Sequence, residues 1–258
     1  MQETLVIAVA QPVCRACDVG ANARAHAEVV RAAGARVVVF PELSLTGYEL
    51  GAAVVAAGDA RLAPLVAACA ETGATALVGA PVEGDHIAVL AVEGGGATVA
   101  YRKMWLGAAE AERFAPGAEP AVWEVDGWRL GLGVCKDTGV VRHADDTAAL
   151  GIDAYVAGIV HGADEVRVHG ERARRIAAAH GVWVALASFA GPTGAGYDET
   201  AGHSGVWSPG GALIAGTGAE PGAFACATLD RAALAGTVPP ASPGPLTRRG
   251  GARRAARG

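Results

Sequence analysis

Short runs of β-branched and other apolar residues alternate with alanine-rich stretches along almost the whole chain. This alternation is typical of α/β proteins, in which helices cover the faces of a central sheet system. The runs expected to form strands are Leu5–Ala10, Val37–Phe40, Ala76–Gly79, Ile87–Val92, Thr98–Tyr101, Ala121–Val125, Trp128–Val134, Ala154–Val160, Val182–Ala187, Gly205–Trp207, Ala212–Ala215 and Phe224–Thr228. The stretches expected to form helices are Asn22–Ala33, Ala60–Thr72, Arg142–Leu150 and Glu165–His180.

Turn residues divide these elements and show that some neighbouring strands are antiparallel. The Glu93–Gly96 segment and the Asp126-Gly127 pair each join two expected strands, and both are typical of β-hairpins. Gly34 and Gly73 follow expected helices, where glycine commonly ends a helix in the left-handed conformation. The sequence therefore predicts mixed β-sheets with helices outside them.

Composition indicates one large folded domain. Of the 258 residues 52% are hydrophobic and 18% are charged, enough apolar surface to offset the entropy of ordering. We place the folded domain at residues 1–238. Residues 239–258 are rich in Pro, Gly and Arg, and we expect this C-terminal tail to be poorly ordered.

Charge and cysteine content restrict the possible partners. The net charge is −5, and five of the 21 basic residues lie in the last twelve positions, so the expected domain is more acidic than the whole chain. An acidic domain argues against nucleic-acid binding, which needs clustered Lys or Arg. Five cysteines are too few for a disulfide scaffold, and no apolar run is long enough to span a membrane. We expect a cytoplasmic protein with no membrane partner.

Three chemically complementary residues follow expected strands. Glu42 comes directly after Val37–Phe40 and Pro41, Lys103 follows the strand that ends at Tyr101, and Cys135 follows Val134. In α/β folds, catalytic groups gather at the carboxyl ends of strands. A carboxylate can take the proton of a thiol, and an ammonium can stabilise an oxyanion together with the backbone N–H of Lys136. Such a group of residues suits nucleophilic attack on a carbonyl or nitrile carbon.

The segments around these residues resemble the three signature motifs of the nitrilase superfamily of carbon–nitrogen hydrolases. The segments are Phe40-Pro-Glu-Leu-Ser-Leu-Thr-Gly-Tyr48, Tyr101-Arg-Lys103 and Gly131-Leu-Gly-Val-Cys-Lys-Asp137. Similar flanks are found at Glu110-Ala-Glu-Arg-Phe-Ala-Pro-Gly117, at Arg172–Gly181 and at Gly202-His-Ser-Gly205. The resemblance extends from about Leu5 to Asp230.

This resemblance implies a fold, a mechanism and an assembly. The fold would be a four-layer α-β-β-α sandwich of two mixed sheets, usually paired with a second copy through its helices. Glu42 corresponds to the general base, Lys103 to the oxyanion-stabilising lysine, Cys135 to the nucleophile and Glu110 to a second, supporting glutamate. Glu112 is the rival for the last role. No metal or organic cofactor is implied.

Several positions depart from the family pattern. After the cysteine, Val140-Val141-Arg142 and Asp145 stand where the family commonly has Phe-Pro-Glu and then a basic residue. The acid and the base have therefore exchanged positions relative to the family. We expect Arg142 and Asp145 still to form an attractive pair on a helix. Lys136 replaces a frequent aromatic residue, and Cys-Lys-Asp favours an amidase-like member over true nitrilases, which typically carry Cys-Trp-Glu.

The substrate is expected to lie among three loops, 44–51, 160–168 and 189–200. Tyr48, Lys136 and His161 are the candidate substrate-binding residues. Cys14 and Cys17 have the spacing of a metal or redox pair, but no second pair accompanies them, so we expect no metal site. Cys226 is expected to pack in the core.

The sequence leaves more than one activity open. The first is hydrolysis of a small amide or carbamoyl compound through a thioester, releasing ammonia or an amine. The alternatives are hydrolysis of a nitrile by the same triad, or a catalytically silent fold that binds a metabolite or partner. Taken singly, the same residues could be a buried structural cysteine, a strand-end carboxylate paired with an arginine and an exposed lysine.

Overall fold

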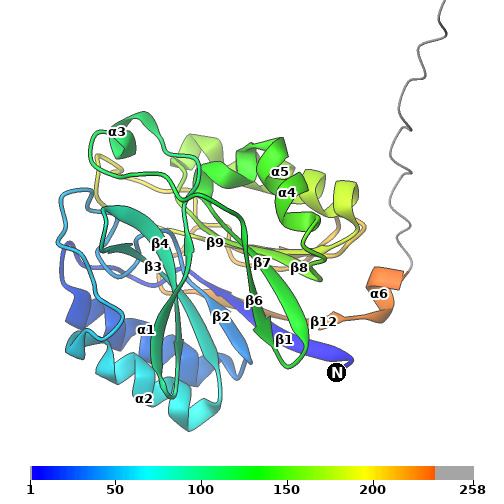
Figure 1. Cartoon of the computed structure of the whole chain (residues 1–258), viewed down its shortest axis with the longest axis horizontal. Helices are drawn as coiled ribbons and strands as arrows, with labels where there is room; N and C mark the ends of the chain where they lie inside the picture. Colours follow the sequence, from blue (N-terminus) through cyan, green and yellow to red (C-terminus); the bar gives the residue numbers. More distant parts are fainter. Residues whose placement is uncertain (1, 236–258) are drawn as a thin grey trace, which may run out of the picture.

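Two six-stranded sheets form the centre of the computed structural model, which describes residues 2–235 (Figure 1). The first sheet has the order β12 (Phe224–Asp230), β1 (Thr4–Ala10), β2 (Val37–Val39), β3 (Thr75–Val82), β4 (His86–Glu93) and β5 (Gly96–Arg102). The second has the order β11 (Leu213–Gly216), β10 (Gly205–Trp207), β9 (Trp183–Ser188), β8 (Ala154–Ile159), β7 (Trp128–Val134) and β6 (Ala121–Val125). Both sheets are mixed. In the first sheet β1, β2 and β3 are parallel neighbours, and in the second sheet β7, β8 and β9 are parallel neighbours. All other neighbouring strands in the two sheets are antiparallel.

Helices cover the outer face of each sheet. The helices α1 (Val19–Ala33) and α2 (Ala63–Thr72) pack on the first sheet, and α4 (Val141–Ala148) and α5 (Val166–His180) pack on the second (Figure 1). Shorter helices are α3 (Ala108–Ala111), α6 (Ala232–Ala235) and the 3₁₀ turns η1 (Ala60–Leu62), η2 (Cys135–Gly139) and η3 (Ala163–Glu165). The predicted four-layer α-β-β-α sandwich is therefore confirmed.

The alternation of side chains along the strands creates separate hydrophobic layers. On β1, Ile7 and Val9 belong to the cluster between the two sheets, whereas Ala8 and Ala10 belong to the cluster under α1 and α2. Successive side chains of a strand point to opposite faces, so a strand buried on both sides is apolar at every position. This explains why the inner strands have continuous apolar runs in the sequence.

Local signals place the turns where the sequence predicts them. Asp126 and Gly127 both have positive φ, 53° and 83°, as a two-residue type I′ hairpin requires. Gly34 ends α1 at φ 59°, and Asp18 caps its first turn by accepting the Ala21 N–H at 2.9 Å. The helix therefore begins three residues earlier than the predicted start at Asn22.

Some predictions about surface residues are wrong. Arg142 pairs with Asp146, at 3.3 Å, rather than with Asp145, which instead contacts His180 at 3.3 Å. Positions i and i+4 also face each other on a helix, and here the second acid takes the contact. Cys226 is exposed on β12 instead of lying in the core.

The boundary at residue 238 and the tail at 239–258 lie outside the described residues. Within those residues, none of the helices is both long and apolar enough to cross a membrane.

Candidate active site

Glu42 lies in a tight turn that runs between the two sheets. β2 ends at Val39, and the backbone of residues 40–43 passes over Gly79 on β3 and Gly158 on β8. A Cβ added to Gly79 would lie 2.2 Å from the Leu43 nitrogen, and one added to Gly158 would lie 2.8 Å from the Glu42 nitrogen. The lack of side chains at these two strand positions is what allows the turn to hold Glu42 in the interior.

We expect Gly158→Ala to displace this turn. The new methyl group would overlap the Phe40 carbonyl oxygen, 2.5 Å from the Cβ position, and overpacking of this kind costs about 1–3 kcal/mol. The free energy of unfolding, measured with urea, should fall. Gly170→Ala, in the helix α5 with only a flexible Arg174 nitrogen at 3.4 Å, is the matched control and should not destabilise the protein. Equal effects of the two substitutions would contradict this account of the turn.

Lys103 joins two carboxylates in the protein interior. Its Nζ lies 2.6 Å from Oε1 of Glu42 and 2.7 Å from both carboxylate oxygens of Glu110. The side chains are almost fully buried, with exposed fractions of 1%, 0% and 4% for Lys103, Glu42 and Glu110. Oε2 of Glu42 is buried and has no hydrogen-bond partner within residues 2–235. An unpaired buried carboxylate oxygen is costly, so a hydrogen-bond donor brought to this atom would be stabilising.

Glu110 is held in place by the short helix α3 and by Tyr48. Its Oε2 accepts the Gly107 N–H at 2.6 Å, and its Oε1 accepts the hydroxyl of Tyr48 at 2.9 Å. Glu112, the rival candidate, is exposed. The structure thus brings Glu110, and not Glu112, to the lysine, and Tyr48 contacts this glutamate as well as lining the cavity described below.

Cys135 follows β7 at the first position of η2 and has a φ of 38°. Positive φ is strained for a residue with a Cβ, and such strain is found at sites where a side chain must be aimed in one direction. The thiol donates a hydrogen bond to the Val160 carbonyl at 3.2 Å. Cys135 is partly exposed, so its sulfur can be reached from the cavity.

A buried polar network fixes the turn that carries Cys135. The Asp137 carboxylate accepts the N–H groups of Val134 and Trp105, both at 2.9 Å, and the hydroxyl of Tyr101 at 2.8 Å. Tyr101 lies near the end of β5, just before Lys103, so Asp137 connects the cysteine turn to the lysine. On its other side, the Tyr101 hydroxyl contacts Nε2 of the buried His143 at 2.8 Å.

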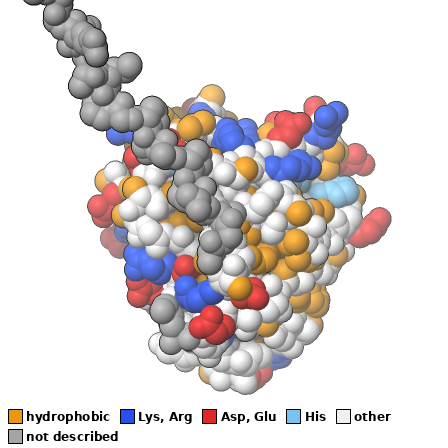
Figure 2. All heavy atoms as spheres, turned by 90° about the vertical axis from the view of Figure 1, so that its right-hand side faces the viewer, with side chains coloured by type: hydrophobic (Ala, Val, Ile, Leu, Met, Phe, Trp, Pro, Cys, Tyr) orange, Lys and Arg blue, Asp and Glu red, His pale blue; other side chains and the backbone are white. Residues whose placement is uncertain are grey.

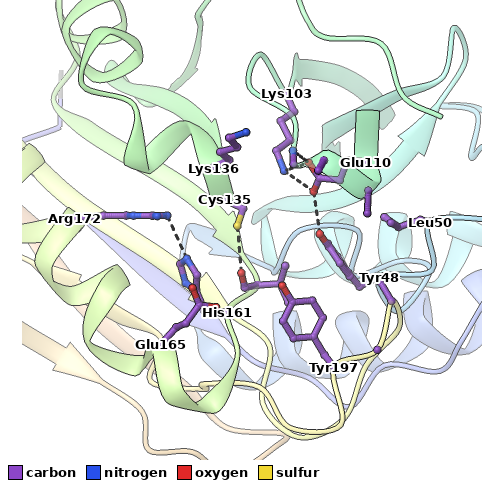
Figure 3. A pocket seen from close by; sticks show the side chains of 16 residues that line it. Tyr48, Leu50, Lys103, Glu110, Cys135, Lys136, His161, Glu165, Arg172 and Tyr197 are labelled. Carbon is purple, nitrogen blue, oxygen red and sulfur yellow. Dashed lines mark hydrogen bonds and ion pairs between the residues drawn. The ribbon is translucent and has the colours of Figure 1, made fainter. Parts of the chain in front are cut away.

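One cavity of about 380 Å³ opens above these residues (Figure 3). Lys103, Glu110 and Cys135 line it, and Glu42, which is not among the lining residues, contacts Lys103. Its other walls come from Tyr48, Leu50, Gly107, Ala108, Ala109, Lys136, Val160, His161, Glu165, Arg172, Ala195, Gly196 and Tyr197. All three predicted substrate-binding residues and all three predicted loops therefore reach this cavity. Arg172, Glu165 and Tyr197 line it as well, and the sequence did not indicate them as substrate-binding residues.

The buried charges shift the pKa values of the site. Burial raises the pKa of Glu42 to about 8, with Lys103 opposing this shift and the negative charge of Glu110 adding to it. Burial and then the charge of Glu42 raise the pKa of the Cys135 thiol to about 12, against the effect of Lys103. Burial alone would lower the pKa of Lys103, but the surrounding negative charges outweigh it and the net shift is upward. The resting site therefore holds a thiol, and a base is required to ionise it.

The raised pKa of Glu42 predicts an acid limb in the pH profile. The motif resemblance implies that Glu42 is a general base, which works only when ionised, so kcat/KM of the expected reaction should fall as the pH drops below about 8, approaching tenfold per pH unit well below that value. Lys103 stays charged throughout this range because its pKa is raised. The check is kcat/KM against pH, with circular dichroism at each pH to show that the protein remains folded. A flat profile between about pH 6 and pH 8 would contradict this role of Glu42.

No metal centre is found in the part of the chain that the structure describes, because no group of three or more His, Cys, Asp or Glu residues there could hold an ion. Cys14 and Cys17 are free cysteines. The titratable side chains that line the cavity are Cys135, Lys103, Lys136, Arg172, His161, Glu110, Glu165, Tyr48 and Tyr197.

Comparison with known proteins identifies the family. The sequence pattern of the carbon–nitrogen hydrolases matches residues 6–237. A hydrolase from the pqqF 5′ region of Pseudomonas protegens is 30% identical over 246 residues, covering 89% of this chain and 84% of that protein. The chain therefore belongs to the carbon–nitrogen hydrolase family of the nitrilase superfamily, as its motifs indicate.

Solved structures agree with this fold. Nit3 of Saccharomyces cerevisiae, a nitrilase-superfamily member, has a TM-score of 0.81 at 21% identity, over 92% of this chain and 93% of its own. An amidase from Nesterenkonia sp. AN1 has a TM-score of 0.75 at 25% identity, over 89% of this chain and 92% of its own. That structure is of a mutant form of the amidase and shows the acetamide moiety of fluoroacetamide added covalently at the active-site cysteine.

Proposed function

We propose that this protein is an amidase-like hydrolase that uses Cys135 as a nucleophile, Glu42 as general base and Lys103 as oxyanion stabiliser. Its substrate is a small amide or carbamoyl compound, and no cofactor takes part. The observation that carries the proposal is the buried ion-pair cluster of Glu42, Lys103 and Glu110, in which Lys103 and Glu110 line the same cavity as the strained Cys135.

In the first half-reaction, Glu42 takes the thiol proton and Sγ of Cys135 attacks the carbonyl carbon. The oxygen that becomes negative faces the ammonium of Lys103 and the backbone N–H of Lys136, which stabilise it. The C–N bond then breaks, the leaving nitrogen takes the proton from Glu42, and ammonia or an amine departs. A thioester on Cys135 remains.

In the second half-reaction, Glu42 accepts a proton from water, and the resulting hydroxide attacks the thioester. The C–S bond breaks, the acid leaves, and the proton held by Glu42 returns to the sulfur. Glu110 keeps Lys103 in position through its two 2.7 Å contacts and is itself held by Tyr48. The one general base serves both halves of the reaction.

Ammonia release from a panel of aliphatic amides, carbamoyl compounds and nitriles tests this proposal. We expect turnover of amides or carbamoyl compounds by the wild type and none by Cys135→Ala. The exposed Cys226 offers a matched control, since Cys226→Ala should retain full activity. Turnover of nitriles alone would favour the nitrilase alternative. No ammonia from any compound, with Cys135 unreactive to iodoacetamide, would favour the silent binding protein.

The preference for an amidase over a nitrilase rests on Cys135-Lys136-Asp137 and on a related structure. Another structure of the Nesterenkonia amidase, a mutant with alanine in place of a cysteine, is a complex with butyramide. We take butyramide as the first neutral amide to test.

We also propose that the protein forms a homodimer, as the family resemblance implies. Val141, at the start of α4, and Leu150, just beyond its end, are 55% and 40% exposed, which leaves apolar side chains available on this helical layer. Figure 2 shows a separate group of hydrophobic side chains, in the middle of the face that corresponds to the right-hand side of Figure 1. Light scattering coupled to size-exclusion chromatography should give twice the monomer mass of 25.7 kDa, and a monomer at micromolar concentration would contradict the proposal.

A further inference from the structure

A guanidinium group without an acidic partner lies in the wall of the cavity that holds Cys135 (Figure 3). It belongs to Arg172, in the middle of α5. Its Nη1 donates to Nε2 of His161 at 3.2 Å and contacts Oγ1 of Thr138 at 3.4 Å. Both partners are uncharged acceptors. Within residues 2–235, no carboxylate lies within ion-pair distance of the Arg172 guanidinium.

His161 orients this cation without neutralising it. Burial and then the charge of Arg172 lower the pKa of His161 to about 3, so the imidazole is neutral and its Nε2 accepts. Gly139 leaves the space that the guanidinium fills, because a Cβ at that position would lie 3.0 Å from Cζ of Arg172. Of the five N–H groups of a guanidinium, those on Nε and Nη2 have no acceptor among the described residues.

The cation lies close to the nucleophile. The Thr138 hydroxyl that contacts Arg172 donates to the carbonyl oxygen of Cys135 at 2.6 Å, so one hydroxyl separates the guanidinium from the backbone of the cysteine. Lys136 adds a second cation to the cavity wall, with Nζ donating to the Leu106 carbonyl at 2.5 Å. The acid on this side is Glu165, whose Oε2 accepts the Gly162 N–H at 3.1 Å.

We propose that Arg172 binds a carboxylate of the substrate, and that the preferred substrates are short monoamides of dicarboxylic acids. The amide carbon would face Cys135, and the carboxylate at the other end of the molecule would accept N–H bonds from the guanidinium. A planar guanidinium in a partly buried site matches the geometry of a carboxylate, which can accept two parallel N–H bonds. This inference rests on the proposed amidase function and adds the substrate class.

The test compares charged and neutral amides of similar length. We expect kcat/KM of the wild type to be higher for succinamate or glutaramate than for butyramide. Arg172→Gln should lower this preference by about tenfold or more, mainly through KM, because one charge-assisted interaction is lost. Arg167→Gln removes the same charge from an 87% exposed side chain of the same helix and should leave the preference unchanged.

Two results would overturn the inference while leaving the amidase proposal intact. One is a wild-type preference for butyramide, and the other is an equal loss for both substrates in Arg172→Gln. If no amide is hydrolysed, the amidase proposal fails, and a binding measurement then tests whether Arg172 holds a carboxylate. In a Cys135→Ala background, calorimetry should show glutaramate binding that weakens about tenfold with Arg172→Gln. Absent binding, or binding that does not depend on Arg172, would contradict the carboxylate site.

Discussion

Glu42→Gln is expected to reduce amide hydrolysis by about a hundredfold to ten-thousandfold, the contribution typical of a positioned general base. The substitution keeps the shape of the side chain but removes the group that must take the proton of Cys135. Because the thiol pKa is raised to about 12, very little thiolate forms without that base. The measurement is kcat/KM for the best amide found, together with the rate of Cys135 alkylation by iodoacetamide. Hydrolysis should fall, whereas alkylation should not fall in parallel, because the substitution also removes the Glu42 charge that helps to raise the thiol pKa.

Glu112→Gln is the matched control for this prediction. Glu112 carries the same carboxyl group near the site but is exposed, so its replacement should leave hydrolysis and alkylation within about twofold of the wild type. Hydrolysis by Glu42→Gln within about threefold of the wild-type rate would exclude Glu42 as the base.

Lys103→Met is expected to affect both stability and activity. It removes the one cation that contacts Glu42 and Glu110 among the described residues and leaves two buried carboxylates side by side. Loss of one partner of a buried ion pair typically costs about 3–5 kcal/mol. Urea denaturation should show this loss, and hydrolysis should be abolished because no ammonium faces the developing oxyanion.

The stability effect can be separated from the catalytic one. Lys103→Met combined with Glu110→Gln removes one of the unpaired charges, so part of the lost stability should return while activity stays absent. Arg31→Met breaks the exposed pair with Glu71, whose side chains are 42% and 55% exposed, and should change stability little. A Lys103→Met protein as stable as the wild type would contradict the buried cluster seen in the structure.

Most of the fold could be predicted because its signals are local. Asp126-Gly127 determines a hairpin by its backbone preferences alone, and Gly34 and Gly73 end helices in the left-handed conformation. The helix α3 has only four residues, too few to show a helical period, so the sequence did not indicate it. The pairing of β12 with β1 joins the two ends of the described chain and depends on tertiary packing, which no local pattern encodes.

The candidate catalytic residues could be predicted from the sequence, but several residues that line the outer wall of the cavity could not. Glu42, Lys103 and Cys135 stand directly after strands and in recognisable motifs. Arg172 lies in a helix that was predicted, yet its role depends on which face of α5 meets the cavity and on the space beside Gly139. These are three-dimensional relations. The choice of Asp146 over Asp145 as the partner of Arg142 is of the same kind, since both acids are within reach on a helix.

The central claim is that Cys135 carries the acyl group during turnover, and mass spectrometry of a quenched reaction tests it most directly. The protein is mixed with an amide that it hydrolyses, and the reaction is quenched with acid within the first turnovers. The peptide that contains Cys135 should then carry the added mass of the acyl group. Cys135→Ser should not show this thioester. Rapid hydrolysis with no adduct on Cys135, or an acyl group on Cys14, Cys17, Cys69 or Cys226 instead, would contradict the account.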